Sequence, residues 1–150
     1  MHRFIRILPG FIAASLAAYV AGSILNTQFV IGAHTIGGAP VSTGIGDRLT
    51  MTLADITGTV LYLAIIAIGF AIAFLIARSL KRVLPGLAGV AYPIAGAAAI
   101  SVALGLMYMQ FQTVPVSGAR SMFGFAAQML AGGFGGWVFH TFNQTADNAK

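Results

Sequence analysis

Cysteine and glutamate are absent from this 150-residue chain, and only three aspartates supply negatively charged side chains. Without cysteine there are no disulfides, no thiolate metal ligands and no cysteine nucleophile. Asp47, Asp55 and Asp147 all lie outside the centres of the apolar segments, whereas proton-coupled carriers usually hold an acid within the membrane. Metalloenzymes need clustered His, Asp or Glu ligands. We therefore expect no metal site, no cofactor and no catalytic residues, and we predict that the protein is not an enzyme.

Histidine is equally sparse, with His2 and His140 expected at one membrane edge and His34 on the opposite side. No two histidines are placed to face each other inside the membrane, as a bis-histidine haem would require. The chain also lacks the motifs of zinc proteases, serine hydrolases and phosphate-binding loops.

Charge is scarce as well, because charged residues make up only 7% of the chain, whereas a soluble domain usually carries about 25%. Four segments contain no Asp, Glu, Lys or Arg at all: residues 7–25, 56–77, 86–109 and 121–139. Each is close to the ~20 residues that a helix needs to cross a ~30 Å hydrocarbon core. The sequence therefore predicts an all-α polytopic membrane protein, with residues 1–150 forming a single domain.

We expect an antiparallel bundle of four transmembrane helices, because the connections between the later segments are short. The helices are predicted at about 5–26, 52–82, 85–112 and 117–142. Residues 27–50 are glycine-rich and are predicted to form an interfacial loop between the first two helices, lying on the headgroups or folded over the bundle.

The predicted second helix has a start signal, since Thr52 and Asp55 have the spacing of a capping box. Arg120 is expected to begin the fourth helix, on the same side of the membrane as Asp55 and Arg48. We therefore predict that Asp55 and Arg120 interact at the mouth of the bundle. The alternative is that Asp55 only caps its helix and that Arg120 contacts headgroup phosphates.

Lysine and arginine are distributed unevenly between the two sides of the predicted bundle. Two lie on the side of the first and third connections, Arg48 and Arg120, and six lie on the other side: Arg3, Arg6, Arg78, Lys81, Arg82 and Lys150. The positive-inside rule then places both termini in the cytoplasm, and we take the membrane to be the bacterial inner membrane. All but Lys150 of those six are expected to contact anionic lipid. This distribution is not that of a nucleic-acid-binding stripe, so no nucleic-acid partner is expected.

Small residues at four-residue spacing mark three of the predicted helices, and such residues let helix backbones approach closely in lipid. The glycines predicted to pack helices together are Gly10, Gly22, Gly105, Gly124, Gly132 and Gly136. The second helix is instead bulky and is expected to be the most exposed to lipid, with Ile66 and Ile68 on a tolerant surface.

Gln128 is the one strongly polar residue expected near mid-depth. We predict that it makes an interhelical hydrogen bond; the alternative is a contact with a quinone or a small polar solute. Arg48, Asp55 and Arg120 are the other candidates for a ligand site or a polar core.

These observations favour a non-enzymatic membrane subunit or scaffold that packs through its Gly/Ala-rich helix faces. Its expected partners are membrane lipids and either further copies of itself or a larger membrane complex. Two alternatives are a small-solute channel or carrier and a quinone- or lipid-binding membrane protein.

Overall fold

The computed structural model describes residues 2–36 and 44–148, and over these residues it contains helices and turns but no strand. Four of the helices are long and apolar enough to cross a membrane. The predicted fold class, an all-α membrane protein with four spanning helices, is therefore confirmed. In chain order the elements are α1 (His2–Ile36), α2 (Ile45–Gly58), α3 (Val60–Val83), η1 (Pro85–Leu87), α4 (Ala91–Phe111), η2 (Ser117–Arg120) and α5 (Met122–Asn148).

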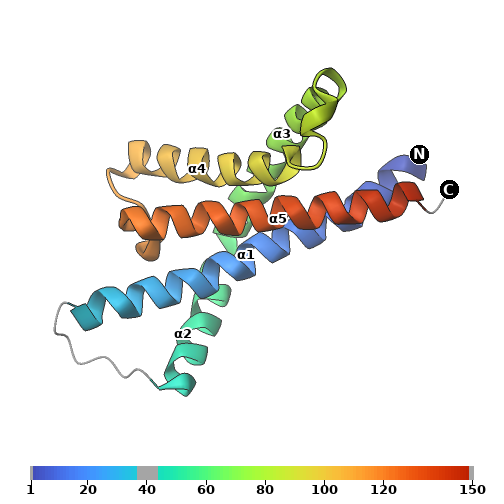
Figure 1. Cartoon of the computed structure of the whole chain (residues 1–150). Helices are drawn as coiled ribbons and strands as arrows, with labels where there is room; N and C mark the ends of the chain where they lie inside the picture. Colours follow the sequence, from blue (N-terminus) through green and yellow to red (C-terminus); the bar gives the residue numbers. More distant parts are fainter. Residues whose placement is uncertain (1, 37–43, 149–150) are drawn as a thin grey trace.

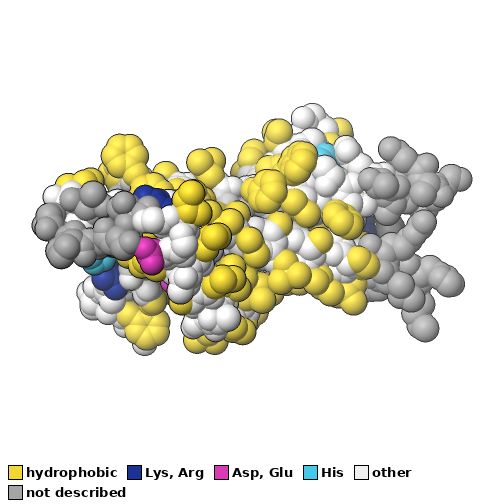
Figure 2. Space-filling view, turned by 90° about the horizontal axis from the view of Figure 1, so that it is seen from below, with side chains coloured by type: hydrophobic (Ala, Val, Ile, Leu, Met, Phe, Trp, Pro, Cys, Tyr) yellow, Lys and Arg dark blue, Asp and Glu magenta, His cyan; other side chains and the backbone are white. Residues whose placement is uncertain are grey.

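Helix α5 is central, because it packs extensively against both α1 and α4. These three helices run side by side, and α3 crosses them at a steep angle (Figure 1). Both termini and η1 lie at one end of the bundle, called here the termini end. The end of α1 and η2 lie at the opposite end, called here the η2 end. Hydrophobic side chains cover the middle of the molecule in Figure 2, and most of the visible Lys, Arg and Asp side chains gather toward one end.

The interfacial loop predicted over residues 27–50 is largely helical. Helix α1 continues to Ile36 and α2 begins at Ile45, while residues 37–43 lie outside the described part of the chain. The extension of α1 is stabilised by burial, since Thr27 and Ile31 are almost fully enclosed. The membrane-spanning part of α1 is 28 residues long, or about 42 Å. Because this exceeds a ~30 Å hydrocarbon core, α1 must tilt or project from it.

The helix predicted over residues 52–82 is two helices, α2 and α3, which are separated at Gly58 and Thr59. Thr59 leaves the helical conformation, with φ −110° and ψ 30°. Its backbone N–H and its Oγ1 both donate to the Asp55 carbonyl oxygen, at 3.0 and 2.6 Å. The Asp55 carbonyl oxygen thus accepts both bonds at the end of α2, and the glycine at position 58 weakens the helix beside it. The predicted capping box is therefore wrong, because Thr52 and Asp55 lie inside α2.

The later helices also differ from their predicted bounds. The segment predicted as helix over 85–112 begins with the short η1, and α4 starts only at Ala91. The segment predicted over 117–142 begins with η2, and α5 extends to Asn148. Arg120 therefore precedes the last helix and does not lie within it.

Helix α2 is amphipathic, and its polar face is turned toward the protein. Ile45, Leu49 and Leu53 follow one another at four-residue steps and are 59–79% exposed. Arg48 and Asp55, on the other face, hydrogen-bond to side chains of α1. An exposed apolar face beside membrane-spanning helices is typical of a helix lying at the boundary between headgroups and acyl chains.

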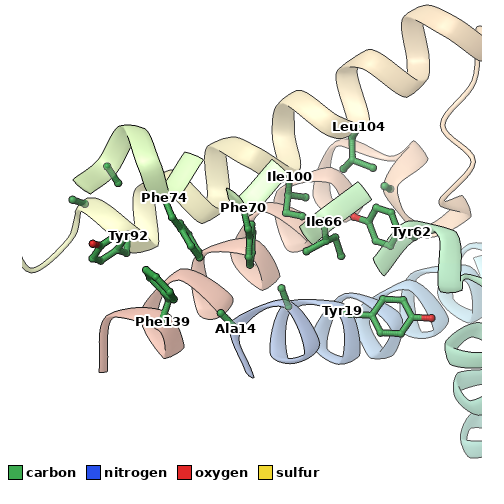
Figure 3. Close-up of a cluster of buried hydrophobic side chains, with 14 of the residues drawn as sticks. Ala14, Tyr19, Tyr62, Ile66, Phe70, Phe74, Tyr92, Ile100, Leu104 and Phe139 are labelled. Atoms are coloured by element: carbon green, nitrogen blue, oxygen red, sulfur yellow. The ribbon is translucent and has the colours of Figure 1, made fainter. Parts of the chain in front are cut away.

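The core is built around one stripe of α3, which Figure 3 places between the other helices. The stripe consists of residues at four-residue steps: Tyr62, Ile66, Phe70 and Phe74. The Phe74 ring stacks on Phe139 of α5, with 4.5 Å between the ring centroids. The expectation that Ile66 faces a tolerant surface is wrong, because only 1% of it is exposed, whereas Ile68 is 64% exposed. Helix α3 is nevertheless the least buried span, with 28% of its most apolar stretch buried.

Glycines bring the backbones of α4 and α5 into contact. A Cβ atom on Gly136 would lie 2.1 Å from the Tyr92 carbonyl oxygen, and one on Gly132 would lie 2.5 Å from the Gly96 carbonyl oxygen. No side chain can be added at such distances without moving a helix. The structure therefore places Gly132 and Gly136 directly at the α4–α5 crossing.

The other glycines that were expected to pack helices together occupy three kinds of environment. Gly10 and Gly22 face α5, where a Cβ atom would lie 3.0 Å from the Phe142 Cβ and 2.8 Å from the Gln128 Oε1, respectively. Gly124 packs on η2, with a Cβ position only 1.7 Å from the Gly118 carbonyl oxygen. For Gly105 the expectation is wrong, because no described neighbour lies within 4 Å of its Cβ position.

Candidate functional site

The Asp55 carboxylate, in the last turn of α2, is bound by the end of α1. Asn26 Nδ2 and Thr27 Oγ1 both donate to Asp55 Oδ2, each at 2.8 Å. These donors are uncharged, so the carboxylate is stabilised by hydrogen bonding alone. Arg120 does not pair with Asp55; its Nε donates to the Val114 carbonyl oxygen at 3.0 Å. The predicted Asp55–Arg120 interaction is therefore corrected to Asp55 with Asn26 and Thr27.

Asn26 connects Asp55 to the segment before α5. While its amide nitrogen donates to Asp55, its Oδ1 accepts a 2.7 Å hydrogen bond from the Gly118 N–H in η2. Gly118 allows this close approach, because a Cβ atom there would lie 2.8 Å from the Asn26 Cα. One amide side chain thus joins α1, α2 and η2.

Tyr19 fastens the junction between α2 and α3. Its hydroxyl donates to the Ile56 carbonyl oxygen and lies 3.2 Å from Thr59 Oγ1. Near the start of α2, Arg48 donates to Gln28 Oε1 of α1. Of the three charged candidates from the sequence, Arg48 and Asp55 attach α2 to α1, whereas Arg120 stabilises the α4–α5 connection.

Gln128 lies deeper in the bundle and is only 2% exposed. Its Nε2 donates to the Gly22 carbonyl oxygen of α1 at 2.9 Å. Its Oε1 lies 3.5 Å from the Tyr62 hydroxyl of α3, which is the limit of a hydrogen bond. The amide therefore links α1, α3 and α5, and it has the geometry of the expected interhelical hydrogen bond.

Each of these polar residues joins neighbouring helices or segments through its hydrogen bonds. Among the described residues no group of three or more His, Cys, Asp or Glu could hold a metal ion. The sequence did not single out Asn26 and Thr27, because both lie at a predicted helix end. The polar triplet Asn26–Thr27–Gln28, directly after an apolar segment, was the available signal.

An apolar groove lies on the surface between α1 and α5. It has a volume of about 420 Å³ and is lined by Leu16, Ala17, Val20, Ala21, Ile24 and Phe134. The Phe134 ring stacks on the Trp137 ring beside it, with 6.0 Å between the centroids. The lining combines half-buried alanines with exposed large side chains.

Comparison of the chain with protein-family models, with curated proteins and with solved structures finds no match.

Proposed function

We propose that this protein is a non-enzymatic membrane subunit that assembles with a second copy of itself through the α1 side of the α1–α5 groove. The observation that carries the proposal is a ridge beside a furrow on α1. The ridge consists of large apolar residues at four-residue steps, each 40–57% exposed: Leu8, Ile12, Leu16, Val20 and Ile24. The furrow beside it consists of half-buried alanines at the same spacing: Ala13, Ala17 and Ala21.

This pattern suits self-association. Ridges formed by residues four apart pack into the matching furrows of a second helix at a crossing angle near −50°. Alanine in the furrow lets the two backbones approach, which matters in lipid because the hydrophobic effect does not drive helix association there. Ridge and furrow lie on the same helix. In a two-fold dimer the ridge of each copy can therefore pack into the furrow of the other.

The internal hydrogen bonding supports a structural role. The carboxylate of Asp55 and the amide of Gln128 are both engaged by neighbouring helices, so their polar groups stabilise the bundle itself.

We further propose that the protein resides in the bacterial inner membrane. The alternative is that the α1 surface binds a different membrane protein in a larger complex, and not a second copy of this chain.

The mass of the protein in mild detergent tests the proposal, with Ala17→Leu and Ala21→Leu filling the furrow. Ala71→Leu is the matched control, because it makes the same change at an exposed position of α3. We expect a dimer for the parent chain and for Ala71→Leu, and a monomer for the two furrow variants. A parent chain that is monomeric, or that is held only in a complex with a different protein, would contradict self-association.

A small-solute carrier is the second candidate, and one observation favours it. A polar stripe at four-residue steps runs along the buried side of α1: Ser15, Tyr19, Ser23 and Thr27. The Oγ of Ser15 has no hydrogen-bond partner among the described residues. Flux of a defined polar solute into vesicles, present in the parent chain and abolished by Ser15→Ala or Gln128→Leu with the fold intact, would favour the carrier over the scaffold.

A further inference from the structure

Three helices converge around the Tyr92 ring at the termini end. Lys81, in the last turn of α3, places its Nζ 4.6 Å from the centroid of the Tyr92 ring. His140 of α5 approaches the same ring, with 6.2 Å between the two centroids. Tyr92 itself is only 7% exposed, so the ring forms a fixed support for both basic side chains.

This end of the bundle carries positive charge without a described acid. Arg78 and Arg82 lie on the same helix turns as Lys81. The two carboxylates whose side chains are described, Asp47 and Asp55, both belong to α2, and the Asp55 carboxylate is bound at the η2 end. Among the residues whose side chains are described, this end therefore has an excess of positive charge beside Tyr92.

We propose that Lys81, Tyr92 and His140 form a binding site for the phosphate headgroup of an anionic phospholipid. A lysine held over an aromatic face is attracted to the ring quadrupole and still has ammonium protons to donate to a phosphate oxygen. A ring N–H of His140 supplies a second donor. Basic pockets between transmembrane helices bind anionic headgroups in this way. Leu80 and Leu84 are exposed nearby on α3 and beyond its end, and offer apolar surface to an acyl chain.

A simpler role for these cations would be to complement the dipole at the end of α3, where Lys81 and Arg82 both lie in the last turn. That role is shared by the two residues, but only Lys81 is positioned over Tyr92. Arg82 is exposed and is therefore the matched control: it has the same charge and the same turn, and its expected contact with anionic lipid is a general surface attraction that does not involve Tyr92.

The test is native mass spectrometry of the full-length chain in detergent, titrated with phosphatidylglycerol and, separately, with phosphatidylcholine of the same acyl chains. We expect the parent chain to prefer phosphatidylglycerol. Lys81→Gln and His140→Gln should each weaken phosphatidylglycerol binding by about five-fold or more, whereas Arg82→Gln should change it by less than about two-fold. Lys81→Arg should retain the preference, because arginine also stacks on aromatic rings.

Three results would overturn the site. Equal losses for Lys81→Gln and Arg82→Gln would indicate only a general surface potential. Equal binding of phosphatidylcholine would show that the headgroup charge is not recognised. Displacement of the lipid by millimolar inorganic phosphate would show that a free anion, and not a lipid, is the ligand. If Lys81→Gln fails to fold, the comparison of His140→Gln with Arg82→Gln decides the same question.

Discussion

The Asp55 carboxylate accepts hydrogen bonds from the uncharged side chains of Asn26 and Thr27. Substitution of these partners, and not of Arg120, should therefore lower the stability that Asp55 provides. A hydrogen bond to a charged group typically contributes about 1.5–3 kcal/mol, and the partial exposure of Asp55 reduces this. We predict a coupling free energy of about 1 kcal/mol between Asp55→Ala and Thr27→Val in a double-mutant cycle of unfolding in detergent.

The matched cycle pairs Asp55→Ala with Arg120→Ala, and its coupling free energy should be close to zero. The reason is that Arg120 is engaged by the Val114 carbonyl oxygen and not by Asp55. A larger coupling with Arg120 than with Thr27 would restore the ion pair expected from the sequence and refute the hydrogen-bonded arrangement.

Gln128 should contribute a modest stabilisation and nothing specific to a ligand. Gln128→Leu removes the hydrogen bond to Gly22 and the long contact with Tyr62. Measured hydrogen bonds between membrane helices average about 0.6 kcal/mol and reach about 2 kcal/mol, so we expect a loss in that range. Thermal unfolding in detergent measures it, with the exposed Gln110→Leu as control. Equal stability of the two variants would mean that the buried amide does not join the helices.

At the scale of helices, α4 and α5 can approach closely only because Gly132 and Gly136 have no side chains at their crossing. We predict that Gly136→Ala lowers the free energy of unfolding by about 1–3 kcal/mol, the usual effect of overpacking. Gly105→Ala makes the same change on the open side of α4 and should be neutral or stabilise by up to about 1 kcal/mol, since alanine favours helix. Similar destabilisation by both substitutions would show that helix propensity, and not close approach, governs these positions.

The spans were predictable, because hydropathy over about 20 residues reports directly on the cost of placing side chains in lipid. The break at Gly58 and Thr59 was not predictable, because the hydropathy stays high across it and the change lies in the backbone angles of Thr59. The extension of α1 was missed for a related reason. Thr27 and Ile31 are almost fully buried and Thr27 bonds Asp55 of α2, and such tertiary contacts outweigh the turn-like composition of the sequence around them.

The polar site was predictable only in part. Scarcity of charge drew attention to Asp55, Arg120 and Gln128, and the structure gives Gln128 the expected interhelical geometry. The partners of Asp55 were not predictable, because the predicted loop separated it from Asn26 and Thr27. In the structure, α1 continues as a helix past these two residues, and α2 packs beside them so that both bond Asp55.

At the scale of the whole molecule, the orientation in the membrane should follow the distribution of lysine and arginine. By sequence, six of the eight belong to the predicted cytoplasmic side and two to the opposite side. We predict that reporter fusions at residues 83 and 150 give cytoplasmic signals and that fusions at 40 and 115 do not. A cytoplasmic signal at 40 or 115 would reverse or break the proposed topology.

Self-association through the α1 ridge and furrow is the central claim, and disulfide cross-linking in native membranes tests it most directly. The chain contains no cysteine, so a single Ala17→Cys or Ala21→Cys is the only thiol present. Two such cysteines can bridge only if their Cβ atoms approach to about 3.5–4.5 Å. We predict an oxidant-dependent covalent dimer for one or both furrow positions and none for Ala71→Cys on α3. Cross-linking at Ala71 but at neither furrow position would contradict the proposed interface.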